Sequence, residues 1–270
     1  DTVKNDEPIR EPIARLGKMI SDRMEVMLGK EKITKESPEY WGLAPICTDE
    51  QALIAIKMGK RKPRTFAQIK KLTKINDDEY LQKQLDEMSN NGLIEYNWEN
   101  PQHEKQYVLP MYVPGSAEFT NMNADVLRDH PEMGRFFERM SRLPLEKVTP
   151  MVPLGGAGIG MHVIPVEKAI EMENHSVSVE HISHWLDKYE GKYAASPCSC
   201  RRSRVTYDEG CADDPEGWCI AVGDMADYVV ETNKGGRYIT REEVYEILEQ
   251  AEENGFVHQI TNIDGENKIF

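Results

Sequence analysis

Cysteine is the residue type whose spacing most clearly indicates chemistry in this chain. Four of the five cysteines in 270 residues fall inside one segment of 22 residues. These are Cys198, Cys200, Cys211 and Cys219. Four thiolates from one short segment are the ligand set of a tetrahedral zinc ion or of an iron–sulfur cluster. The sequence therefore predicts a metal centre in this segment, which we call the cysteine window.

The spacing within the window, C-x-C-x₁₀-C-x₇-C, separates these two kinds of centre. Structural zinc sites usually take their cysteines as two close pairs, roughly two to four residues apart within each pair. Here only Cys198 and Cys200 are close. Cysteines that are far apart in the sequence suit a cubane cluster, because its four iron atoms are separated in space. We therefore expect a 4Fe-4S cluster and keep zinc as the alternative. A redox-active pair of Cys198 and Cys200 is a third interpretation.

Charged and aromatic residues in the window are expected to set the reduction potential of a cluster there. Arg201 and Arg202 follow the close cysteine pair, and their charge would offset that of the cluster and its thiolates. Trp218 precedes Cys219 and is expected to shield the cluster from solvent. The remaining cysteine, Cys47, is most simply a buried small apolar residue.

Composition and charge limit the class of protein. A net charge of −14 argues against nucleic acid or an anionic membrane as the partner of the whole chain. No run of about 18 apolar residues is present, and the charged N-terminus lacks the apolar region of a signal peptide. An odd number of cysteines without a secretory signal indicates a reducing compartment, so we expect a cytoplasmic protein. The length favours two domains.

Hydrophobic periodicity predicts an α+β protein that is mostly helical. Residues 1–44 are expected to form a helical arm, with one amphipathic helix over residues 13–28. Residues 45–115 are expected to form a winged helix, and residues 116–170 a helix and a glycine-rich connector. Residues 171–270 would then form a smaller domain that holds the four-cysteine site and ends in a helix and a hairpin.

The winged-helix prediction rests on three helices followed by two strands. A capping box, Thr48-x-x-Gln51, begins the first helix, and Gly59 ends it. The second and third helices are expected over residues 65–72 and 77–90, and the two strands over residues 93–96 and 106–109.

Charge decides which partner such a domain would take. A basic run favours DNA; it comprises Lys57, Lys60, Arg61, Lys62, Arg64, Lys70, Lys71 and Lys74. The helix that would enter the major groove carries carboxylates against a lone Lys83; they are Asp77, Asp78, Glu79, Asp86 and Glu87. Carboxylates repel phosphates, so we expect a protein-docking or structural domain rather than a DNA-binding one. A metal- or redox-sensing transcription regulator is the alternative.

Several further elements are expected downstream. One helix should cover residues 123–140. The glycines from 155 to 160 lack the spacing of a nucleotide-binding loop and predict a connector, followed by a strand over residues 161–166. Helices are expected over residues 180–189 and 220–230. A capping box, Thr240-x-x-Glu243, should begin the last helix, and the hairpin turn should fall at Asp264-Gly265.

Several short motifs resemble those of ferredoxin-type 4Fe-4S oxidoreductases. The core motif is Pro197-Cys198-Ser199-Cys200-Arg201, with Cys211 and Cys219 after it. Other stretches of the resemblance are Tyr112-Val113-Pro114-Gly115-x-x-Glu118-Phe119, Val163-Ile164-Pro165-Val166, Gly236-Arg237-x-Ile239-Thr240-x-Glu242-Glu243 and Glu253-Asn254-Gly255-Phe256-Val257-His258. The resemblance is to the N-terminal, winged-helix-bearing region of this family and covers roughly residues 45–270.

The resemblance implies a place in an electron-transfer chain, with other oxidoreductase domains or subunits as partners. In such proteins this region looks like an accessory module. Further cysteine-rich motifs follow it, and longer members add a part that binds flavin and pyridine nucleotide. Because this chain stops at Phe270, ligands from those motifs would lie beyond it. The residues here predict no substrate-binding active site of their own.

Overall fold

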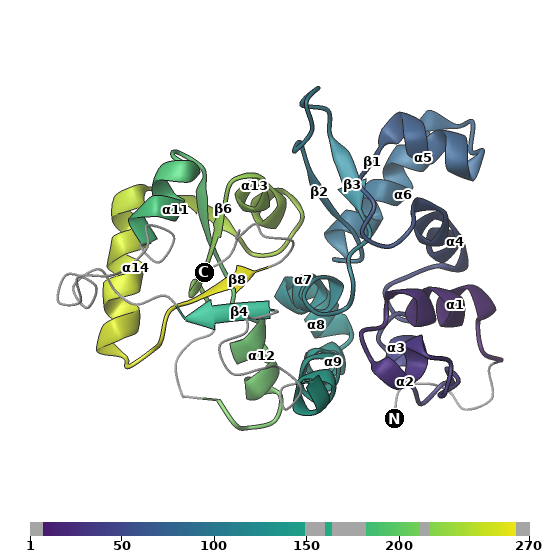
Figure 1. The fold of residues 1–270 in the computed structure, drawn as a ribbon, viewed down its shortest axis with the longest axis horizontal. Helices are drawn as coiled ribbons and strands as arrows, with labels where there is room; N and C mark the ends of the chain where they lie inside the picture. Colours follow the sequence, from purple (N-terminus) through teal and green to yellow (C-terminus); the bar gives the residue numbers. More distant parts are fainter. Residues whose placement is uncertain (1–7, 149–159, 164–181, 211–215, 263–270) are drawn as a thin grey trace. The chain divides into compact units, whose positions relative to one another are not determined.

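The computed structural model describes residues 8–148, 160–163, 182–210 and 216–262. It is an α+β protein with two small three-stranded antiparallel sheets and a two-stranded one (Figure 1). The chain divides into two compact units. Unit 1 comprises residues 1–151, 199–213 and 232–234, and unit 2 comprises residues 152–198, 214–231 and 235–270. The predicted arm and the predicted winged helix both fall within unit 1.

Unit 1 begins with α1 (Glu11–Ile20), α2 (Met24–Met27) and α3 (Pro38–Trp41). The apolar face expected on the first helix is confirmed, because Ile13, Leu16 and Ile20 are fully buried. The prediction of one helix over residues 13–28 is wrong. The chain becomes extended at Ser21, with φ −62° and ψ 140°. The Ser21 and Arg23 side chains bond to the buried Glu39, and this tertiary contact ends the helix.

A body of three helices and three strands follows in unit 1. Its elements are α4 (Asp49–Met58), β1 (Arg64–Thr65), α5 (Phe66–Thr73), α6 (Asp78–Asn90), β2 (Glu95–Asn97) and β3 (Gln106–Val108). The capping box at Thr48 is confirmed, and Gly59, with φ 81°, ends α4. The sheet has the order β1-β3-β2 and pairs Thr65 with Gln106. β1 was not expected, because a strand of two residues has no periodicity to detect.

The other helices in the described part of unit 1 are α7 (Ser116–Met122), α8 (Ala124–Asp129), α9 (Met133–Val148) and α12 (Ser199–Val205). The prediction of one helix over residues 123–140 is wrong, since the chain leaves the helix between Asp129 and Met133. Pro131 lies in this break, and proline disfavours a helical residue before it. Asn123 caps α8 by accepting hydrogen bonds from the backbone N–H groups of Asp125 and Val126.

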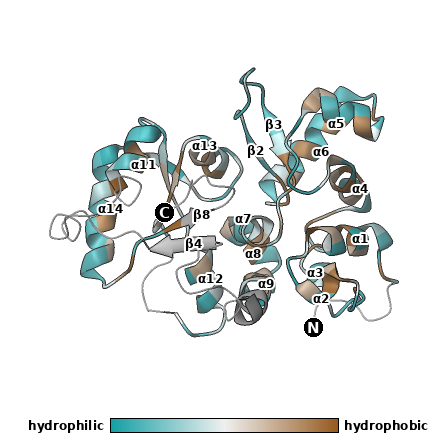
Figure 2. Ribbon diagram, in the orientation of Figure 1, coloured by the Kyte–Doolittle hydropathy of each residue, from teal (hydrophilic) through white to brown (hydrophobic). Residues whose placement is uncertain are grey.

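Unit 2 contains a sheet with the order β6-β5-β7, in which all pairs are antiparallel. The strands are β5 (Tyr193–Ser196), β6 (Cys219–Val222) and β7 (Arg237–Ile239). The helices are α11 (Ile182–Lys188), α13 (Asp224–Glu231) and α14 (Arg241–Glu253). Figure 2 shows α13 largely hydrophobic and α14 mostly hydrophilic, in agreement with the narrow buried stripe of α14.

The prediction of a helix over residues 220–230 is wrong in its first part. Ile220, Ala221 and Val222 form a strand that is buried throughout. A short apolar run has the same appearance in a buried strand and in a buried helix, so periodicity could not separate them. Gly223, with φ 62°, turns the chain from β6 into α13.

The end of the described chain contains a confirmed cap and an unexpected strand pairing. Thr240 caps α14 through a capping box with Glu243. β8 (Gln259–Asn262) pairs antiparallel with β4 (Gly160–Val163). The expected turn at Asp264-Gly265, and most of the glycine-rich connector, lie outside the described residues. No helix in the described part of the chain is long and apolar enough to cross a membrane.

Candidate metal centre

Strand pairing in unit 2 brings two of the predicted ligands to one end of the sheet. The last residue of β5, Ser196, pairs with Cys219, the first residue of β6. The Ser196 hydroxyl donates a hydrogen bond of 3.3 Å to the Cys219 carbonyl. Cys198 lies two residues beyond Ser196, and both cysteines are half-buried. The strand pairing therefore brings Cys219 level with a residue that is two positions before Cys198 in the sequence.

Cys200 lies in unit 1, in the first turn of α12, and its side chain is exposed. Side-chain hydrogen bonds tie α12 to α7 and to α9. The Ser199 hydroxyl donates to the Glu118 carbonyl at 2.8 Å, and the Asn121 amide donates to the Ser199 carbonyl at 2.6 Å. The Ser203 hydroxyl donates to the Gly134 carbonyl at 2.6 Å. Cys200 is thus carried by a helix that packs on α7 and α9.

The three predicted tuning residues have defined surroundings. The Arg202 guanidinium donates to the carbonyls of Asn121 and Met122 at 3.3 and 2.5 Å, so it helps to hold α12 on α7. Arg201 is half-buried beside it. Trp218 packs edge-to-face against Phe256, with ring centroids 5.1 Å apart. The effect of the arginines on a potential stays a prediction, as does shielding by the tryptophan.

The four ligands are not all among the described residues, because Cys211 falls in the segment 211–215. Within the part of the chain that the structure covers, no three His, Cys, Asp or Glu side chains form a group that could hold a metal ion. Cys47 is buried, as expected, and its thiol donates to the Thr48 carbonyl. Burial raises the pKa of the Cys47 thiol to about 12, which makes it a poor ligand or nucleophile.

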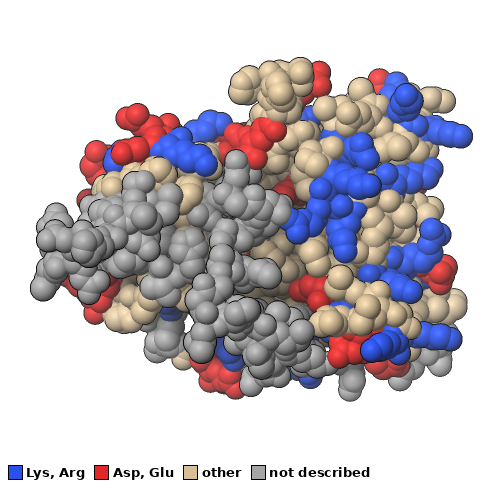
Figure 3. Space-filling view, viewed as in Figure 1, with Lys and Arg blue, Asp and Glu red and all other residues tan. Residues whose placement is uncertain are grey.

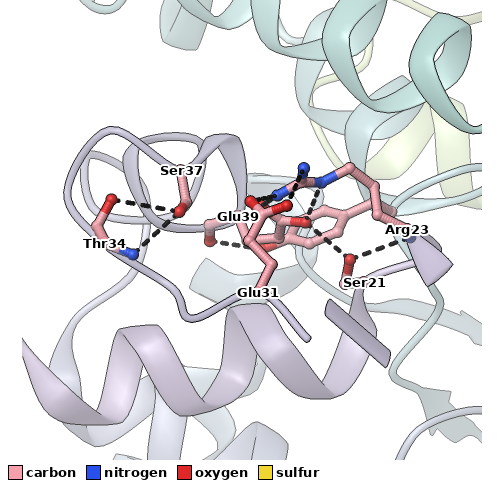
Figure 4. Close-up of polar contacts among 7 residues, drawn as sticks. Ser21, Arg23, Glu31, Thr34, Ser37 and Glu39 are labelled. Atoms are coloured by element: carbon pink, nitrogen blue, oxygen red, sulfur yellow. Dashed lines mark hydrogen bonds and ion pairs between the residues drawn. The ribbon is translucent and has the colours of Figure 1, made fainter. Parts of the chain in front are cut away.

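A buried ionic cluster in unit 1 was not expected from the sequence (Figure 4). Arg23 lies between Glu31 and Glu39 and forms two hydrogen bonds with each carboxylate. The bonds to Glu39 are 2.6 and 2.7 Å long, and the Glu39 side chain is fully buried. Ser21 donates to Glu39 as well, at 2.8 Å. This ionic cluster links the extended residues after α1 to α3, so its role is structural.

Two further carboxyl groups of unit 1 have strongly shifted pKa values. Burial raises the pKa of Asp22 to about 7, and Asp22 Oδ1 has no hydrogen-bond partner among the described residues. Burial also raises the pKa of Glu118 to about 8, although its Oε2 accepts a 2.6 Å hydrogen bond from the Gly115 N–H. The Asp22 carboxylate adds to the shift of Glu118 by repulsion.

Little in the sequence points to these acidic residues. In many sequences an acidic residue between apolar ones simply lies in an exposed turn. Only the tertiary contacts distinguish Asp22 and Glu39 from acidic residues of that kind. The one available signal was that Asp22 and Arg23 fall on an otherwise amphipathic stretch.

Comparisons of the chain with protein-family models, with curated proteins and with solved structures gave no match.

Proposed function

We propose that the chain is an iron–sulfur-binding module of a cytoplasmic oxidoreductase, which transfers electrons or stabilises the domain that does so. The ligands of a 4Fe-4S cluster would be Cys198, Cys200, Cys211 and Cys219. The pairing of β5 with β6 supports this proposal, because it sets Cys219 opposite Ser196, which is two residues before Cys198 in the sequence. A cluster, when bound, would supply one-electron transfer.

The surroundings of these cysteines suit a partly shielded centre. Cys198 and Cys219 are half-buried, and Trp218, the residue before Cys219, packs edge-to-face against Phe256. Low solvent access raises the influence of nearby charge on a redox centre. A structural zinc ion would use the same thiolates and is the alternative, since the two centres differ in metal content and not in ligand type.

We further propose that residues 45–115 form a winged helix that docks other oxidoreductase domains or subunits. The order α4-β1-α5-α6-β2-β3, with β3 in the middle of the sheet, supports this topology. The acidic residues of α6 argue against nucleic acid as the partner and against a transcription regulator. Asp77 caps α6, and Asp78 and Glu79 lie in its first turn, where carboxylates favour the helix dipole.

The decisive experiment is metal and sulfide analysis of protein purified without oxygen, together with a visible absorption spectrum. We expect iron and acid-labile sulfide in the wild type and their loss in the Cys198→Ala variant. The matched control is Cys47→Ala, which removes a thiol outside the window and should keep the iron content of the folded protein unchanged.

Two results would contradict the cluster. One zinc ion per chain with no visible colour would make the cysteine window a structural zinc site. Equal iron loss in Cys198→Ala and Cys47→Ala would mean that the loss reports unfolding and not ligation, and thermal denaturation of both variants identifies that case.

A further inference from the structure

Unit 1 carries a concentration of positive charge that the iron–sulfur proposal does not use. Residues 57–74 contain eight Lys and Arg and no Asp or Glu. The rest of the chain holds the other 25 basic residues and all 47 acidic ones, a net charge of −22. A run of charge is often only a solvated surface, so its placement in the fold decides whether it forms one patch.

The fold gathers this run onto the connected elements α4, β1 and α5, and we call the result the basic surface. Figure 3 shows Lys and Arg side chains grouped over this body, with few acidic side chains among them. Lys57 Nζ donates to the Thr73 carbonyl at 3.2 Å and so joins α4 to the end of α5. Arg64 Nε donates to the Met58 carbonyl at 3.3 Å. The Arg61 N–H donates to the Leu109 carbonyl at 2.8 Å, which ties the α4–β1 loop to the strand β3.

Two residues of the basic surface occupy backbone conformations that favour glycine or asparagine. Arg61 has φ 57°, and Lys74, at the C-cap of α5, has φ 61°. A long charged side chain at such a position is strained relative to glycine. Basic side chains are therefore present at two positions where the local backbone opposes them. Strain of this kind points to a use for the side chain.

We propose that the basic surface docks a carboxylate-rich segment of a partner protein. Lys60, Lys62, Lys71 and Lys74 form no ion pair with a described residue, so they are available for carboxylates of a partner. A DNA duplex fits less well, because its phosphates run in a continuous line. Such a line would extend past α5 onto the acidic start of α6 at Asp77–Glu79. This docking does not require the cluster.

Binding of a labelled oligoglutamate peptide, followed by fluorescence anisotropy, tests the proposal. A labelled DNA duplex is the second probe. We expect the wild type to bind the peptide, with an affinity that falls about tenfold or more between about 20 mM and about 200 mM salt. The variant Lys60→Glu/Lys62→Glu/Lys71→Glu should lose binding by at least about tenfold.

A second triple variant separates the surface from net charge. Lys18→Glu/Lys30→Glu/Lys32→Glu makes the same change of charge at exposed lysines of α1 and of the loop between α2 and α3, and it should bind within about twofold of the wild type. Equal loss in both triple variants would overturn the proposal, as would tighter binding of the duplex than of the peptide. Absence of peptide binding at low salt would also overturn it.

The strained position provides an independent check against unfolding. Lys74→Gly relieves the positive φ, so it should raise the melting temperature while it weakens peptide binding. A variant that is more stable and binds less well cannot be explained by loss of structure. If Lys74→Gly binds the peptide as the wild type does, Lys74 is not part of the docking surface.

Discussion

At the scale of single residues, unit 1 buries acidic groups in two different ways. Glu39 is compensated by two hydrogen bonds from Arg23 and one from Ser21. Asp22 and Glu118 have no ion pair among the described contacts, and their pKa values are raised to about 7 and about 8. An uncompensated carboxyl group in the interior is more stable protonated, because burial penalises only the charged form.

This difference predicts a pH dependence of stability. Raised pKa values mean that folded Asp22 and Glu118 hold protons that the unfolded chain releases near pH 4. Their contribution is therefore fully present at low pH and is lost as the pH rises through about 7 and about 8. In the variant Asp22→Asn/Glu118→Gln, the free energy of unfolding should fall less between about pH 5 and about pH 8 than in the wild type.

Urea denaturation across this pH range measures the effect. The exposed pair Asp129→Asn/Glu242→Gln is the control. The pKa values of both carboxyl groups are lowered, so both groups stay ionised in the folded and in the unfolded chain above about pH 5, and the profile of this variant should run parallel to that of the wild type. A pH profile of the first variant that runs parallel to that of the wild type would show that Asp22 and Glu118 ionise normally.

At the scale of secondary structure elements, helix starts follow local rules, whereas the end of α1 follows a tertiary contact. Thr48, Thr65 and Thr240 each accept a hydrogen bond from the backbone N–H three residues later, and each begins a helix. The end of α1 depends instead on α3, which supplies Glu39 to Ser21 and Arg23. Close packing of these two helices also explains the glycine inside α1.

Gly17 provides the test of this packing. By helix propensity alone, Gly17→Ala in the interior of α1 should stabilise the protein by about 1 kcal/mol. A Cβ atom at this position would collide with the backbone carbonyl of Glu39, which cannot move as a flexible side chain would. We therefore expect a loss of about 1–3 kcal/mol in the free energy of unfolding, measured by urea denaturation.

Lys18→Ala, at the exposed neighbouring position of the same helix, should change stability by less than about 0.5 kcal/mol. Stabilisation by Gly17→Ala would mean that α1 and α3 lie further apart than the structure has them.

At the scale of the whole molecule, a segment of three residues returns to unit 1 late in the chain. Thr232–Lys234 belongs to unit 1, and Lys234 is fully buried. Its ammonium group donates to the carbonyls of Ser89, Asn90 and Thr232 at 2.8, 2.6 and 2.7 Å. Ser89 and Asn90 are the last residues of α6, whose terminal carbonyls lack partners within the helix. Lys234 therefore caps a helix that lies about 145 positions earlier in the sequence.

Removal of this cap should be costly. Lys234→Met keeps the length of the side chain but removes the charged donor that three buried carbonyls share. The Ser89 carbonyl still accepts from the Gly92 N–H, and the Asn90 carbonyl still accepts from the Asn123 amide, so the free energy of unfolding should fall by about 1–3 kcal/mol. Lys192→Met is the control, because Lys192 is half exposed and pairs with Asp227 and Asp224; it should cost less than about 1 kcal/mol. Similar losses in chemical denaturation of both variants would contradict the capping role of Lys234.

The sequence alone determined features that depend on near neighbours. The caps at Thr48 and Thr240 follow from one side chain and a backbone N–H three residues away, so the starts of the helices that they begin were predicted from the sequence. Glycine at position 59 ends α4 for an equally local reason, its positive φ. The concentration of cysteines between residues 198 and 219 is likewise visible without any fold.

Only the tertiary structure decided features whose partners are distant in the sequence. β1 and β5 are too short to recognise by periodicity, and each exists because it pairs with a remote strand. The position of Cys219 opposite Ser196 depends on such a pairing. The burial of Glu39 and the cap from Lys234 depend on contacts between segments that no local pattern connects. Local propensity therefore determined where these helices begin. Long-range packing determined which strands pair, where α1 ends and which polar groups are buried.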